Sequence, residues 1–287
     1  MLTLSKITLS KKNILIMLMI KKIKKIIKKI LLRFNIHINY ISSRDDILRF
    51  IDLFKIKIPK NIELIRAGSN NDGGYVVPDI LDEIKYCYSA GVGKNISFEK
   101  FLLKYDIKSY GADGTINSPP EKIKDYKFLK KNIGIINNNN SIRFEDWINL
   151  DSKNETSLIG QIDIEGGEYN LIIDTPLDTL KKFKILVIEF HYLSKINSKI
   201  LYKYFFDSFK KILNIFEICH IHINNAEKQI NIKGIKIPPL LEITFLRKDF
   251  YSKNEMGKIF IPNELDQNNI QENKTEYFDK HWKSRIT

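Results

Sequence analysis

From Lys85 to Ile223 the chain alternates short apolar runs with segments whose apolar residues recur at helical spacing. This alternation predicts a mostly parallel sheet covered by helices on both faces, because parallel strands need a crossover that a helix usually supplies. No helical segment separates the last two strands, so they are expected to form an antiparallel pair at one edge. The expected strands span 85–89, 109–112, 133–136, 158–162, 185–190, 215–223 and 240–246; the expected helices span 97–105, 144–150, 168–173 and 198–213.

The residues before and after this alternation are expected to form separate segments. Residues 44–80 are interpreted as an entry segment, with a short helix over 45–54 and strands over 62–66 and 75–77. The two strands flank Gly68-Ser-Asn-Asn-Asp-Gly-Gly74, whose Asp-Gly and Gly-Gly pairs favour a tight turn. Residues 81–250 then form the main domain, and 251–287 a polar tail.

Residues 1–43 read as a basic arm. Of the 47 lysines and arginines, ten lie in residues 1–33, which contain no acid. Isoleucines recur at helical spacing over 23–30 and lysines fill the other face, so residues 14–34 are expected to bind an anionic membrane surface, with docking on protein as the alternative. The apolar run 14–20 is too short to span a bilayer, which takes roughly 20 residues. A cytoplasmic protein, peripheral at the membrane, is therefore expected.

The net charge of +13 is weak evidence for nucleic-acid binding. Only seven of the basic residues are arginine, the residue best suited to bidentate recognition of phosphates and bases. Nucleic acid is therefore not an expected partner. Cys87 and Cys219 each lie inside an apolar run, which predicts two buried, reduced thiols.

A glycine turn follows the first strand of the alternation. The turn is Ser89-Ala-Gly-Val-Gly93, and Asp113 ends the next strand 20 residues after Gly93. Glycines let the backbone approach a ligand, and an acid at this spacing can accept hydrogen bonds from a ribose. Ile96 stands at the third glycine position of the dinucleotide motif, which argues against the usual NAD site. Ser89, Gly91, Gly93 and Asp113 are thus expected to contact a cofactor with an adenosine half.

Acids and a histidine follow the later strands. Asp163 and Glu165 come after one strand and His191 ends the next, at the edge where ligands bind in sheets of this class. His191 is the preferred general base, because a neutral imidazole accepts a hydroxyl proton near neutral pH. Asp163 or Glu165 could act as a base, orient a hydroxyl or bind a divalent metal. Glu168 is expected to begin the next helix.

His220 and His222 lie two residues apart on an expected strand, so their side chains share a face. With Asp163 they could form a mixed nitrogen and oxygen site for a divalent metal. Hydrogen-bonded histidines at a sheet edge are the alternative.

The segment Gln161-Ile-Asp-Ile-Glu-Gly-Gly-Glu-Tyr169 resembles the Ile-Asp-Ile-Glu-Gly-x-Glu signature of FkbM-type methyltransferases. Further segments are similar to one branch of that family: Arg66 with Asp72-Gly-Gly-Tyr-Val-Val-Pro78, Ser89-Ala-Gly-Val-Gly93 with Ser97-Phe-Glu99, Ile188-Glu-Phe-His191, His220-Ile-His-Ile-Asn-Asn225 and Leu241-Glu-Ile-Thr-Phe-Leu-Arg247. The resemblance covers about residues 60–270. It implies a class I methyltransferase fold, a Rossmann-like seven-stranded sheet with an antiparallel edge hairpin.

The resemblance also implies a reaction, O-methylation of a hydroxyl with S-adenosyl-L-methionine as methyl donor. On this reading Gly91 and Gly93 approach the methionine half, Asp113 holds the ribose, and Asp163 and Glu165 face the reacting centre. Family habit favours a sugar or a cell-surface glycan intermediate as acceptor. The residues expected to contact the acceptor are Asp72, Tyr75, His220, His222 and Asn224.

The sequence leaves two other functions open. One is a nicotinamide-dependent oxidoreductase, which would use the same glycine turn and Asp113. The other is a non-catalytic Rossmann-like binding protein. Titration with S-adenosylmethionine and with NAD distinguishes the three.

Overall fold

The computed structural model describes residues 19, 22, 23, 25–27, 29, 40–251 and 255–287. The chain divides into two compact units, Met1–Ile41 and Ser42–Thr287. Within the first unit the described residues between Met19 and Lys29 are helical. Residues 40–43 of the expected basic arm are described as well, and Ser43 caps the first helix of the second unit. The remaining residues of the arm, and with them the predicted membrane contact of residues 14–34, lie outside the described residues. No helix in the described ranges is long and apolar enough to cross a membrane.

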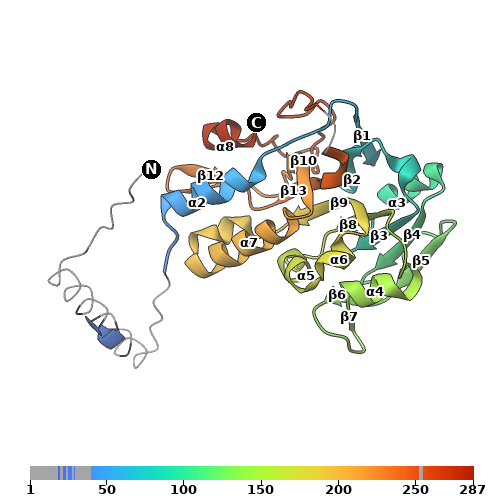
Figure 1. Ribbon diagram of the computed structural model, residues 1–287, viewed down its shortest axis with the longest axis horizontal. Coiled ribbons are helices and arrows are strands. Elements are labelled where there is room, and N and C mark those ends of the chain that lie inside the picture. The colour runs from blue at the N-terminus through green and yellow to red at the C-terminus, as the bar shows by residue number, and fades with distance from the viewer. Residues whose placement is uncertain (1–18, 20–21, 24, 28, 30–39, 252–254) are drawn as a thin grey trace, which may run out of the picture. The chain divides into compact units, whose positions relative to one another are not determined.

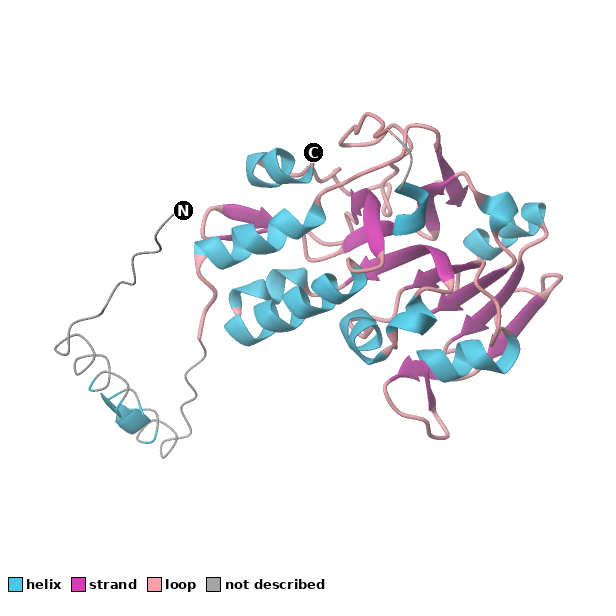
Figure 2. Cartoon of the chain, in the orientation of Figure 1, coloured by secondary structure: helices cyan, strands magenta, loops and turns pink. Residues whose placement is uncertain are grey.

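The second unit is built on a seven-stranded sheet in the order β10-β13-β9-β8-β3-β4-β5 (Figures 1 and 2). β13 runs antiparallel to its neighbours β9 and β10, and the other strands run parallel. The predicted α/β class, mostly parallel sheet and antiparallel edge pair are confirmed, and the architecture is Rossmann-like. The strands are β3 (Tyr86–Ala90), β4 (Lys108–Ala112), β5 (Tyr126–Leu129), β8 (Leu158–Ile162), β9 (Phe183–Phe190), β10 (Phe216–Ile223) and β13 (Leu241–Arg247).

The prediction of one strand of the central sheet is wrong. The segment expected at 133–136 forms β6 (Asn132–Gly134), which pairs with β7 (Ser141–Arg143) outside the central sheet. The edge strand beside β4 is β5, and its residues Tyr-Lys-Phe-Leu are only partly buried. A half-exposed edge strand lacks the continuous apolar run that marks buried parallel strands, so it gives a weak sequence signal.

Helices cover one face of the sheet. They are α2 (Arg44–Ile51), α4 (Phe144–Asp151), α5 (Glu168–Asp174) and α7 (Lys199–Ile212). α2 begins at a capping box, in which the Ser43 hydroxyl accepts from the Asp46 N–H and the Asp46 carboxylate accepts from the Ser43 N–H. α2 and α7 then pack through Phe50 and Phe209, whose ring centroids lie 5.3 Å apart. These helices and the facing strand residues form the larger apolar core.

The other face is covered by the hairpin β1 (Leu64–Gly68) and β2 (Gly74–Pro78), with α3 (Ser97–Leu102). Tyr75 of β2 packs edge-on against Phe98 of α3, and Val187 of β9 belongs to the same apolar cluster. Successive strand residues alternate between faces. Glu189, two residues beyond Val187, therefore faces the hairpin side, and this places a polar edge beside an apolar core.

The segment expected as a polar tail packs against the rest of the second unit. Its helix α8 (Lys280–Ile286) buries Trp282 and Ile286. The Trp282 ring lies 5.2 Å from that of Phe54, and its Nε1 donates to the Lys236 carbonyl at 2.8 Å. A few buried aromatic and apolar side chains anchor this segment, although most of its residues are polar.

The strand order reverses between β3 and β8, because the chain leaves β3 towards β4 and leaves β8 towards β9 on the opposite side. In open sheets of this kind, ligands bind at such a switch point. Gly91 follows β3 with φ +84°, and a Cβ there would lie 1.6 Å from the Asp163 carbonyl oxygen. Only glycine lets the ends of these two strands meet so closely.

Candidate functional site

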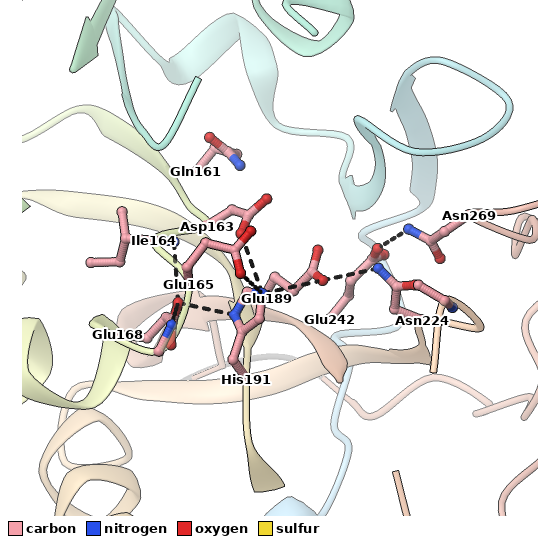
Figure 3. Close-up of polar contacts among 12 residues, drawn as sticks. Gln161, Asp163, Ile164, Glu165, Glu168, Glu189, His191, Asn224, Glu242 and Asn269 are labelled. Carbon is pink, nitrogen blue, oxygen red and sulfur yellow. Dashed lines mark hydrogen bonds and ion pairs between the residues drawn. The ribbon is translucent and has the colours of Figure 1, made fainter. Parts of the chain in front are cut away.

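Three of the predicted site residues meet at the carboxyl ends of β8 and β9. His191 Nε2 lies 3.7 Å from Asp163 Oδ1 and 3.5 Å from Glu165 Oε2 (Figure 3). His191 is buried, Asp163 is partly exposed, and the Glu165 side chain is 83% exposed. The structure thus brings together the three residues that were predicted from the sequence to be catalytic.

Glu168 begins α5 as predicted and also organises the turn before it. Its Oε1 accepts hydrogen bonds from the backbone N–H groups of Ile164 and Gly166 at 3.1 and 3.0 Å. The same oxygen lies 3.1 Å from His191 Nδ1 (Figure 3). Glu168 therefore fixes both the turn carrying Glu165 and the orientation of the imidazole, roles that its helix-start position alone did not indicate.

The electrostatics favour Asp163 over His191 as the proton acceptor. Burial disfavours the imidazolium, but the hydrogen bond that His191 donates to Glu168 and the charges of Glu168, Asp163 and Glu165 outweigh this effect and raise the pKa of His191. Burial raises the pKa of Asp163 to about 7, against the opposing effect of His191. A base with a pKa near the working pH is the most effective one. His191 is better placed to hold a proton and balance the acids.

Two buried glutamates extend this cluster across the sheet. Glu189 of β9 and Glu242 of β13 stand directly opposite one another. Glu189 Oε1 accepts from Asn224 Nδ2 at 2.9 Å, and Glu242 Oε1 accepts from Asn269 Nδ2 (Figure 3). Burial and the charge of Asp163 raise the pKa of Glu189 well above its ordinary value. In the sequence, each of these two glutamates is an acid among the apolar residues of a strand. Glu242 was not predicted as part of this cluster.

The expected metal set of Asp163, His220 and His222 is not assembled. His220 Nε2 lies 2.8 Å from Asp266 Oδ1, and His222 Nδ1 lies 3.5 Å from the same oxygen. Within the described ranges, the metal-ligating atoms grouped with Asp163 come from Glu189 and His191. The two histidines do share a face as predicted, but a segment more than 40 residues further along the chain supplies their acid, which spacing could not reveal.

A cavity of about 390 Å³ opens at the switch point. Its lining includes Gly91, Gly93, Asp113, Ile133 and Ile164, and also Ala112, Thr115, Asn132, Asp163 and Glu165. No heavy atom lies within 4 Å of a Cβ built on Gly93, so the space above this residue is open. The predicted glycine turn and acid thus border one cavity together.

Asp113 closes the glycine turn. Its Oδ2 accepts from the Gly93 N–H at 2.8 Å, and its Oδ1 accepts from the Thr115 N–H and Oγ1 at 2.7 and 2.6 Å. Burial opposes ionisation, but these hydrogen bonds outweigh it and lower the pKa of Asp113. The carboxylate is therefore ionised at neutral pH and held at the cavity wall.

The other predicted contacts fall into two groups. Asp72 and Tyr75 line a smaller cavity of about 100 Å³, which shares Gly91, Gly93 and Asp163 with the larger one. The Tyr75 hydroxyl there accepts from Gln161 Nε2 at 3.1 Å. Ser89, in contrast, is fully buried with its hydroxyl 3.5 Å from Cys87 Sγ, and it lines neither cavity.

Replacing Asp163 with asparagine should stabilise the fold at alkaline pH. The pKa of Asp163 is about 7 in the folded protein and has an ordinary value of 3.8, so the folded state binds this proton more tightly than the unfolded state does. The native protein therefore loses stability as the pH rises from 3.8 through about 7. The substituted amide stays neutral, and the variant should gain on the order of 2 kcal/mol at pH 8, or roughly 4–8 °C in Tm. At pH 4 the two proteins should melt together. Thermal unfolding in EDTA at both pH values measures this, and an equal gain at pH 4 and pH 8 would contradict it.

Comparison with known proteins does not place the chain in a family. No protein-family model matches it, and no curated protein matches it. Function is therefore inferred from the residues of the site and their geometry.

Proposed function

We propose that the protein is an S-adenosylmethionine-dependent O-methyltransferase. The observation that carries this proposal is a pair of neighbouring cavities that share Gly91, Gly93 and Asp163 in their lining, one bordered by Asp113 and both lined by acids. The larger cavity suits an adenosine group, and the smaller one lies on the side of Asp72 and Tyr75. The resemblance of residues 161–169 to the FkbM-type signature supports the same assignment, as does the antiparallel strand β13 next to the edge of a seven-stranded sheet.

The residues of the larger cavity fit the adenosine half of this cofactor. Ile133 and Ile164 offer apolar surface for a purine, and Asp113 offers an ionised carboxylate to ribose hydroxyls. Gly93, which has no neighbour in the direction of a side chain, leaves room for a ligand to approach the backbone.

Charge favours a cationic cofactor over a dinucleotide. The lining of the two cavities includes the acids Asp72, Glu99, Asp113, Asp163 and Glu165, with Lys94 as the only lysine or arginine among the described lining residues. A dinucleotide would bring the two negative charges of its pyrophosphate to the glycine turn, against these acids. A sulfonium and an ammonium group would instead be attracted. This argues for S-adenosylmethionine and against the nicotinamide alternative.

The acids at the junction fit the needs of methyl transfer to oxygen. When bound, S-adenosylmethionine supplies a methyl group that is already activated, so the protein needs no nucleophile. The chain's own residues position the acceptor hydroxyl and take its proton. We assign the proton to the carboxylate of Asp163, which borders both cavities and whose pKa is about 7. His191, held by Glu168, keeps a positive charge beside that carboxylate.

The acceptor is proposed to be a sugar or glycan hydroxyl. The family resemblance supports this class, and Asp72 and Tyr75 on the smaller cavity supply the polar groups that would orient a hydroxyl.

Calorimetric titration of the full chain with S-adenosylhomocysteine and with NAD⁺ tests the cofactor. We expect saturable binding of S-adenosylhomocysteine at one site per chain and no saturation with NAD⁺. Saturation by NAD⁺ alone would support the oxidoreductase, and binding of neither would support the non-catalytic protein.

A further inference from the structure

We propose that Asp163, Glu189 and His191 hold a divalent metal ion. One ligand atom from each residue lies within 4.8 Å of the other two. His191 Nε2 is 3.7 Å from Asp163 Oδ1 and 3.9 Å from Glu189 Oε1. With metal–ligand bonds of about 2.1 Å, these separations correspond to ligand–metal–ligand angles of roughly 120–135°, which small side-chain movements bring to common metal geometries.

The imidazole is already oriented for a metal. Glu168 Oε1 lies 3.1 Å from Nδ1 and accepts its hydrogen bond, while Nε2 faces Asp163 and Glu189 (Figure 3). A bound metal would replace the proton that Nε2 carries in the metal-free protein. A carboxylate behind a histidine is the usual arrangement around metal-ligating histidines, because it fixes the ring and raises its basicity. Asn224 holds the glutamate in a similar way, by donating to Glu189 Oε1.

The local charge calls for a cation. Four carboxylates surround His191: Asp163, Glu165, Glu168 and Glu189. Glu168 and Glu189 are both buried, and throughout the described part of the chain none of the four forms an ion pair with a lysine or arginine. Buried carboxylates are costly unless they are paired or bind a metal. With all four groups ionised, a single imidazolium would balance only one of the charges, and a dication would balance two.

The proposed ion would be reachable and have open coordination positions. Asp163 borders both cavities, and Glu165, 3.5 Å from Nε2, borders the larger one. Two carboxylates with one imidazole suit first-row ions such as Mn²⁺ or Zn²⁺ better than Mg²⁺ or Ca²⁺, which prefer oxygen ligands only. If the proposed function holds, the ion would bind the acceptor hydroxyl and lower its pKa. That consequence rests on the proposed function, whereas metal binding itself does not.

Electron paramagnetic resonance of Mn²⁺ tests the site, because free Mn²⁺ gives a sharp six-line signal that weakens on binding. Titration of the full chain should show one saturable site. The Glu189→Gln variant keeps an acceptor for Asn224 and removes the charge, so Mn²⁺ should bind at least about tenfold more weakly. Glu242→Gln is the matched control. It removes a buried carboxylate directly opposite Glu189 on the next strand, outside the triad, and should leave Mn²⁺ affinity unchanged.

The proposal would be overturned by a wild-type protein that leaves the signal of about 1 mM Mn²⁺ unchanged. Equal affinity in the wild type and the Glu189→Gln variant, or an equal loss in Glu242→Gln, would overturn it as well. Circular dichroism checks that each variant is folded. Titration with S-adenosylhomocysteine in EDTA keeps the two proposals apart. If the chain binds Mn²⁺ but not S-adenosylhomocysteine, the metal site stands and the methyltransferase proposal fails. If it binds S-adenosylhomocysteine but not Mn²⁺, the methyltransferase proposal stands and the metal site fails.

Discussion

Replacing Asp113 with alanine should lower the affinity for S-adenosylhomocysteine by at least about 100-fold, or roughly 2.7 kcal/mol. The variant loses the ionised carboxylate that would accept hydrogen bonds from the ribose, and hydrogen bonds to charged groups are worth roughly 1.5–3 kcal/mol each. It also leaves the Gly93 N–H without its acceptor, which loosens the glycine turn. Calorimetric titration of the folded variant measures the loss.

Thr115→Val provides the control for this experiment. It removes the hydroxyl that donates to Asp113 Oδ1 but keeps the carboxylate, the Gly93 contact and nearly the same side-chain shape. We expect the affinity for S-adenosylhomocysteine to change by less than about tenfold. An Asp113→Ala variant that binds as tightly as Thr115→Val would show that Asp113 supports the turn without contacting the cofactor.

Replacing Trp282 with alanine should cost about 3–5 kcal/mol of folding free energy, as is usual for a large buried aromatic. Trp282 is 1% exposed and packs against Phe54 and Phe278. The substitution also leaves the Lys236 carbonyl without its indole donor. Unfolding by urea gives the free-energy loss, which corresponds to a fall in Tm of roughly 10 °C.

Tyr277→Ala serves as the comparison for Trp282→Ala. Tyr277 lies in the same segment, and its side chain is exposed, so its removal should change stability by less than about 0.5 kcal/mol. If Trp282→Ala costs no more than Tyr277→Ala, residues 278–287 do not belong to the core of the second unit.

The sequence predicted the central sheet well where strands are buried on both faces. The strands around Tyr88, Ile159 and Val187 are mostly apolar and almost entirely buried, as is typical of parallel strands covered on both sides. It failed at β5, where one side is open to solvent, and at α8, where few apolar residues stand among many polar ones. In both places few residues are buried, so the local apolar pattern carries little information about the structure.

Individual residues of the candidate site could be predicted from the sequence only where they directly follow a strand, because the end of the strand then determines where the residue lies. Asp163, Glu165 and His191 follow neighbouring strands, so topology alone brings them together. Asp266 and Asn269 come from the C-terminal segment and contact His220 and Glu242, and no spacing rule predicts such a return. Glu242 was detectable as an acid within a buried strand, because a carboxylate in such a place requires a specific partner.

A crystal structure of the full chain grown with S-adenosylhomocysteine tests the central claim most directly. The proposed function predicts electron density for the nucleoside in the cavity bordered by Gly93 and Asp113, with the ribose against the Asp113 carboxylate. It also predicts that the sulfur lies beside Asp163, which lines both cavities. Density for the ligand elsewhere, or an empty cavity at saturating ligand, would contradict the proposal that this is a methyltransferase site.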